Sequence, residues 1–170
     1  MRVPAVAGVG AGLVGVAALG LAGLATAADQ DAVSVPSVVV RSEAGEVLAR
    51  VPLGGRRFAV TYRNSIYKTL AESRYAVAPP GRFRLVRVAA DQRAVIEEYY
   101  AIPGPDRARE GDRRRWVARP RDRAVFDELT IAATDLGERT LRVPGRRPVR
   151  LWRLVGDDDP IVVLDVQGTG

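Results

Sequence analysis

The sequence contains neither cysteine nor histidine, and lysine occurs only once, at Lys68. Without a thiol or an imidazole, the chain can form no disulfide, no thiolate or imidazole metal ligand, no cysteine nucleophile and no serine–histidine triad. Catalysis would have to use carboxylate, tyrosine or serine groups, and we expect neither a cofactor nor a metal.

Positive charge is abundant instead. All but one of the 26 basic residues are arginine, and the formal net charge is +6 over 170 residues. A basic surface attracts anionic polymers, anionic lipid headgroups and acidic small molecules. The length predicts one domain, and the charge alone does not choose among these partners.

The N-terminal segment has the order of an export signal. Residues 3–28 carry no charge, follow Arg2 and include Ala25-Thr26-Ala27, whose small residues fit the cleft of a signal peptidase. We predict a signal peptide over residues 1–27 and an exported protein, extracytoplasmic or in the cell envelope. The alternative is an uncleaved membrane anchor formed by residues 3–28, because roughly 20 apolar residues can span a bilayer. In either case, we predict that residues 28–36 form a short polar tether.

Residues 37–170 alternate between apolar and polar positions in short runs separated by Gly and Pro. In the run 57–63, Phe58, Val60 and Tyr62 fall on one face of an expected strand. This pattern predicts an all-β domain, an antiparallel β-sandwich or partly closed barrel of about nine to eleven short strands. The expected strands cover residues 38–41, 47–51, 57–63, 71–77, 83–88, 94–101, 115–118, 129–133, 139–143, 149–155 and 161–166.

An arginine-rich stretch, residues 103–123, interrupts the strand pattern. It contains eight arginines and four acidic residues around Trp116. We predict a polar excursion from the sheet that is a solvated loop, an anionic-lipid contact or a protein-docking surface. The export signal argues against nucleic acid as its partner.

The segment from Phe58 to Tyr75, with the runs 129–131, 140–143, 149–154 and 161–166, resembles a bacterial extracytoplasmic family, domain of unknown function family 1850. Asn64 stands where that family usually has histidine, and residues 90–100 replace its glycine-rich loop, which indicates a divergent member. The resemblance implies an accessory of a tripartite ATP-independent periplasmic (TRAP) transporter, with the transporter or its solute receptor as partner.

The strongest candidate site lies where one strand ends and the next begins. A hairpin there would let Arg63 and the amide of Asn64 meet a carboxylate ligand while Glu72 orients them. In the alternative, Asn64-Ser65 is turn chemistry and Glu72 pairs with an arginine. The predicted ligand-binding residues are Arg63, Asn64, Ser65, Tyr67 and Glu72.

Two groups of acidic residues are further candidate sites. Asp91, Glu97 and Glu98 could provide a catalytic or cation-binding pair only if two of them were held a fixed distance apart across a cleft, which sequence spacing does not establish. Glu97 and Glu98 are adjacent and would point to opposite faces of the expected strand, so we expect one carboxylate to be solvated and the other to form a salt bridge. The run 157–159 is acidic but lacks EF-hand spacing, so we expect a turn there.

The function that these observations favour is a non-enzymatic extracytoplasmic binding or accessory domain associated with a TRAP-type transporter. The alternatives are a hydrolase or lyase using carboxylate, tyrosine or serine groups, and an envelope protein that binds anionic lipid or polymer.

Overall fold

The computed structural model describes residues 35–122 and 124–168. The predicted signal, residues 1–27, and most of the predicted tether, residues 28–36, lie outside the described residues. Within these described ranges, no helix is long and apolar enough to cross a membrane.

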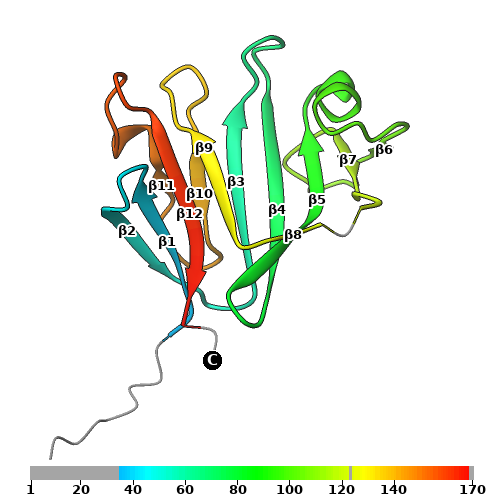
Figure 1. Ribbon diagram of the computed structural model, residues 1–170. Coiled ribbons are helices and arrows are strands. Elements are labelled where there is room, and N and C mark those ends of the chain that lie inside the picture. The colour runs from blue at the N-terminus through cyan, green and yellow to red at the C-terminus, as the bar shows by residue number, and fades with distance from the viewer. Residues whose placement is uncertain (1–34, 123, 169–170) are drawn as a thin grey trace, which may run out of the picture. The chain divides into compact units, whose positions relative to one another are not determined.

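The described residues form two antiparallel sheets (Figure 1). The smaller sheet has the order β2-β1-β12-β9, and the larger has the order β11-β10-β3-β4-β5-β7-β6 with β8 paired to β5. The predicted antiparallel all-β fold is confirmed as a sandwich, since the described strands close no barrel. The strands are β1 (Ser37–Ser42), β2 (Val47–Pro52), β3 (Arg57–Arg63), β4 (Leu70–Ala78), β5 (Arg82–Ala90), β6 (Asp106–Arg107), β7 (Trp116–Ala118), β8 (Val125–Phe126), β9 (Glu128–Ala132), β10 (Thr140–Arg142), β11 (Val149–Arg150) and β12 (Ile161–Gln167).

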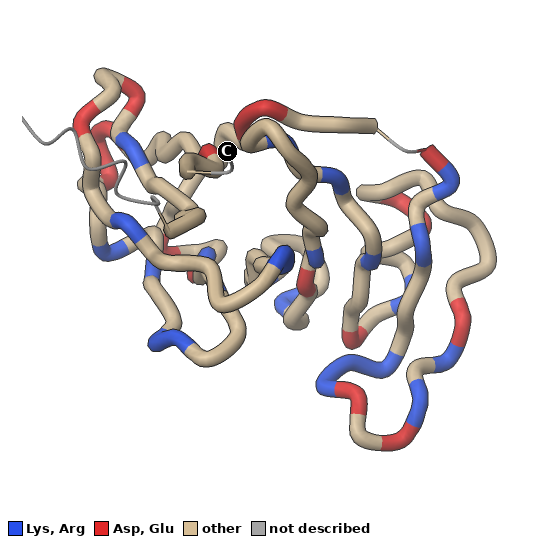
Figure 2. Tube along the Cα trace, turned by 90° about the horizontal axis from the view of Figure 1, so that it is seen from below, with Lys and Arg blue, Asp and Glu red and all other residues tan. Residues whose placement is uncertain are grey.

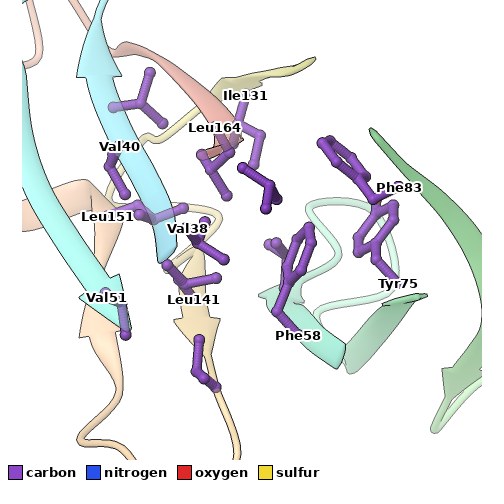
Figure 3. Close-up of a cluster of buried hydrophobic side chains, with 14 of the residues drawn as sticks. Val38, Val40, Val51, Phe58, Tyr75, Phe83, Ile131, Leu141, Leu151 and Leu164 are labelled. Carbon is purple, nitrogen blue, oxygen red and sulfur yellow. The ribbon is translucent and has the colours of Figure 1, made fainter. Parts of the chain in front are cut away.

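The main hydrophobic core fills the space between the two sheets. Phe58 stacks on Tyr75 with ring centroids 5.0 Å apart and meets the edge of Phe83 at 5.2 Å. Figure 3 shows these rings beside Leu164 and Ile131 from the smaller sheet. Burying a side chain of this size contributes about 1.5–3 kcal/mol. This packing fixes which residues of β3 and β4 face inward and which face solvent.

A second hydrophobic cluster lies on the inner face of β4, β5 and β7. It is covered by a short helical turn, η1 (Val95–Tyr99), in which Val95 and Ile96 are fully buried. The predicted strand over residues 94–101 is therefore wrong. Adjacent strand residues point to opposite faces, whereas a helical turn lets these two neighbours bury together against one sheet surface.

The arginine-rich stretch is partly sheet. β7 pairs with β5 through Val88 and Ala118, and β6 pairs with β7, so both strands extend the larger sheet. In the loop between them, Glu110 and Asp112 lie between Arg109 and Arg113, and Figure 2 shows such acidic and basic positions close together along the trace. Treating all of residues 103–123 as an excursion from the sheet is therefore wrong.

The predicted strand over residues 149–155 is also only partly correct. β11 has two residues, and the chain then forms a 3-10 turn, η2 (Leu151–Arg153), that buries Leu151. The described residues form twelve strands, more than expected, because the two-residue strands β6 and β8 are too short to produce an alternating pattern.

Candidate functional site

The hairpin between β3 and β4 is built around Asn64. The Asn64 Oδ1 atom accepts hydrogen bonds from the backbone N–H groups of Ile66, at 3.1 Å, and Tyr67, at 2.9 Å. The Asn64 N–H donates to the Thr69 carbonyl at 2.8 Å, and the residue is 2% exposed. The amide oxygen of Asn64 is thus engaged within the turn, while Ser65 beside it is exposed.

Arg63 ties this hairpin to the loop between β9 and β10. The Arg63 Nη2 atom lies 3.2 Å from the Glu138 carboxylate, and its backbone N–H donates to the Gly137 carbonyl at 2.8 Å. Both charged side chains remain accessible to water. A ligand carboxylate reaching Arg63 would therefore compete with Glu138.

Tyr67 and Glu72 do not join Arg63 in one cluster. The Tyr67 hydroxyl donates to Glu98, at 2.8 Å to one carboxylate oxygen, and this hydrogen bond raises the pKa of Tyr67. Glu72 lies opposite Thr61 on the solvent-facing side of β4 and pairs with Arg74. The five predicted residues therefore do not form one site. Arg63, Asn64 and Ser65 lie together at the turn, Tyr67 contacts Glu98, and Glu72 contacts Arg74.

Arg63, Asn64 and Ser65 border a pocket that we call the inter-sheet pocket. It has a volume of about 410 Å³ and lies between the inner faces of β3 and β4 and strand β9. No described Asp or Glu lines it. The polar side chains that matter most for its chemistry are Tyr62, Tyr75, Tyr99, Tyr100, Arg63 and Arg139.

A chain of hydroxyl groups runs along this pocket. The Tyr62 and Tyr100 hydroxyl oxygens are 3.0 Å apart, and the Ser73 Oγ atom is 2.7 Å from the Tyr100 hydroxyl. Burial, with the neighbouring Tyr100 phenol as a further cause, raises the pKa of Tyr62 well above its ordinary value. Burial also raises the pKa of Tyr75 to about 12. Tyr62 and Tyr75 therefore stay protonated near neutral pH and serve as hydrogen-bonding groups rather than as bases.

Arg139 supplies a positive charge to the same pocket. Its guanidinium carbon lies 5.2 Å from the centroid of the Tyr62 ring. The Arg139 Nε atom is buried and has no hydrogen-bond partner among the described residues. A buried donor without an acceptor is costly, and an anion in the pocket could supply that acceptor.

The sequence contains no local signal for most of this pocket. Tyr100 falls in a run with the residue composition of a strand, and Arg139 begins another strand pattern. Their proximity to Tyr62 depends on how the two sheets and η1 pack. Arg63, Asn64 and Ser65 were found because the turn itself is visible in the sequence.

The acidic residues weighed as further sites have separate partners. Arg93 pairs with Glu97 at 2.8 Å and lowers the pKa of Glu97, Glu98 accepts from Tyr67, and Asp91 pairs with Arg114 at 3.2 Å. Among the described residues, no group of three or more acidic side chains is placed to hold a metal ion. The run 157–159 lies in a turn before β12.

Comparisons of the chain with protein-family models, curated proteins and solved structures gave no match. The resemblance of the β3–β4 region to an extracytoplasmic family stays a prediction.

Proposed function

We propose that this protein is a non-enzymatic binding domain that holds a small acidic solute in the inter-sheet pocket. The observation that carries the proposal is the buried, unpartnered Nε atom of Arg139 beside the hydroxyl chain of Tyr62 and Tyr100. A carboxylate accepts hydrogen bonds from guanidinium and phenol groups, and such charge-assisted bonds are strongest where water is partly excluded.

The residues that line the inter-sheet pocket also favour a negatively charged ligand over a neutral or positive one. The pocket is lined by Arg63 and Arg139 and by no described carboxylate, and Glu138, which pairs with a lining arginine, engages Arg63 and leaves Arg139 to attract an anion. Its volume of about 410 Å³ lies toward the lower end of the roughly 300–1,000 Å³ typical of ligand pockets. A small mono- or dicarboxylate fits this size and charge.

The same geometry disfavours the hydrolase or lyase alternative. Tyr62 and Tyr75 hold their protons, and the pocket has no described acidic side chain to act as a general base. Ser73 is hydrogen-bonded to a phenol, which does not activate it as a nucleophile.

We also propose that the protein works outside the cytoplasmic membrane, with a transporter or its solute receptor as partner. The N-terminal signal order supports a location outside the cytoplasmic membrane, and the family resemblance supports a role beside a TRAP-type transporter or its solute receptor. The genes flanking the coding sequence test this part separately: adjacent transporter genes would support it, and a locus without them would remove its support.

Binding is tested with the full chain by thermal shift and isothermal titration calorimetry against acetate, lactate, succinate and glutamate. At least one acid should stabilise the wild type, and Arg139→Gln should abolish that stabilisation. Arg153→Gln is the matched control, because Arg153 also stacks on an aromatic ring, that of Trp152 at 4.8 Å, but does not line the pocket. If no acid binds, or if both variants bind like the wild type, the proposal is wrong.

A further inference from the structure

The solvent-facing side of the larger sheet carries a second concave site, which we call the arginine groove. It has a volume of about 880 Å³ and is lined by seven arginines and one acidic residue, Glu72. Its position on the opposite side of β3 and β4 separates it from the inter-sheet pocket. The arginines are Arg57, Arg74, Arg87, Arg113, Arg119, Arg142 and Arg146.

Strand register explains how arginines distant in sequence meet here. Arg142 of β10 lies opposite Ala59 of β3, Ala59 lies opposite Arg74 of β4, and Arg74 lies opposite Arg87 of β5. Directly opposed residues share a face of the sheet. The small side chain of Ala59 therefore leaves a hollow in this row, with guanidinium groups on either side.

Only part of the positive charge is neutralised by the protein. Glu72 pairs with Arg74, and Asp112 pairs with Arg87 at 2.8 Å. Arg57 and Arg142 form no ion pair with a described carboxylate, and the Arg142 Nε atom is buried without a described hydrogen-bond partner. Like charges held this close repel one another, so the groove favours a multivalent anion.

We propose that the arginine groove binds a molecule carrying two or more phosphoryl groups. A phosphoryl group offers up to two negative charges and three acceptor oxygens, and the planar guanidinium fork matches those oxygens in pairs. A single small carboxylate would leave most of the surrounding guanidiniums uncompensated. The volume is that of a small-molecule site rather than an extended surface.

The test uses inorganic tripolyphosphate as the probe and isothermal titration calorimetry on the full chain at constant ionic strength. We expect saturable binding that is at least about tenfold tighter than binding of orthophosphate or citrate. Arg142→Gln and the more accessible Arg57→Gln should each weaken it by about tenfold. Ala59→Leu should weaken it similarly by filling the hollow, with no change in charge.

The control is Arg50→Gln, which removes the same charge from β2 of the smaller sheet, outside the groove. Its tripolyphosphate affinity should equal that of the wild type, as should that of Arg139→Gln from the inter-sheet pocket. Equal losses in Arg50→Gln and Arg57→Gln, unchanged binding by Ala59→Leu, or equal affinity for citrate would overturn the proposal. Circular dichroism melts confirm that Arg57→Gln and Ala59→Leu are folded.

The source of the phosphoryl groups is resolved with cardiolipin vesicles, because each cardiolipin headgroup carries two phosphate groups. Sedimentation with vesicles that tripolyphosphate displaces would assign the groove to lipid headgroups. Tripolyphosphate binding without vesicle sedimentation would assign it to a soluble molecule. Both results support phosphoryl recognition, whereas absence of saturable tripolyphosphate binding contradicts it.

Discussion

Glu72 and Arg74 lie two residues apart on β4 and form an ion pair whose two ends have very different access to water. The Glu72 side chain is 5% exposed, while the Arg74 side chain is 38% exposed. Removing the Arg74 charge leaves the buried Glu72 carboxylate without a partner. Removing the Glu72 charge leaves the Arg74 guanidinium, which water can hydrate. The two ends therefore do not contribute equally to stability.

Arg74→Gln should lower the free energy of unfolding by about 3 kcal/mol, since it leaves the Glu72 charge buried without its partner. Glu72→Gln should cost only about 1 kcal/mol, because Arg74 turns to solvent. Urea unfolding of both variants at neutral pH measures the difference. Equal losses, or a larger loss in Glu72→Gln, would contradict this asymmetry.

Asn64 should matter for stability through its side-chain oxygen. Asn64→Ala leaves the N–H groups of Ile66 and Tyr67 without their acceptor and should cost about 2 kcal/mol. Asn64→Asp keeps the acceptor and should cost less than about 1 kcal/mol. Chemical denaturation compares both with Ser65→Ala, an exposed neighbour expected to stay within about 0.5 kcal/mol of the wild type. Similar losses for the Ala and Asp variants would refute the role of this oxygen.

Alkaline pH should destabilise the fold through its buried phenols. Burial raises the pKa of Tyr75 from 10.0 to about 12, so above pH 10 the unfolded chain releases a proton that the folded chain retains. The stabilisation is complete below pH 10 and is lost as pH rises toward about 12. Urea unfolding across this range should give a steeper decline for the wild type than for Tyr75→Phe, by up to about 1.4 kcal/mol per pH unit. Identical slopes would show that Tyr75 titrates as it does in the unfolded chain.

Limited trypsin digestion should begin within the loop between β6 and β7. Arg109 and Arg113 are exposed there, whereas Arg107 and Arg115 are held by the ladder that joins the two strands. Asp112→Asn removes the ion pair to Arg87 and should accelerate these cuts several-fold, as mass spectrometry of early fragments would reveal. Earlier cleavage at Arg142 or Arg150 would mean that the edge containing β10 and β11 opens first.

The fold could be predicted where one strand face is buried. Phe58, Val60 and Tyr62 alternate with polar residues, and β3 begins and ends where that pattern does, at Arg57 and Arg63. The same reasoning failed at η1, because Val95, Ile96, Tyr99 and Tyr100 have side chains that favour strands. Tertiary packing determines the conformation of this segment. In a helical turn, the adjacent residues Val95 and Ile96 both pack against the inner face of β5 and bury it.

In the candidate sites too, features that depend on neighbouring residues could be predicted from the sequence, whereas contacts between distant strands could not. The turn at Asn64 depends on neighbours in the sequence, so it could be anticipated. Glu72 was expected near Arg63, but its partner depends on the order in which β10, β3, β4 and β5 pair. The row that brings Arg142, Arg74 and Arg87 together exists only in that register.

The two hydrophobic clusters are bridged by Leu85, which packs against both. The cluster beneath η1 has small members, including Ala71, Ala90 and Ala118, and so buries less apolar surface per residue than the main core. Its amides should exchange with deuterium through sub-global openings while β1 and β12 remain protected. Because Tyr99 and Tyr100 lie at the end of η1 and line the inter-sheet pocket, a local opening of η1 would reshape that pocket without unfolding of the domain.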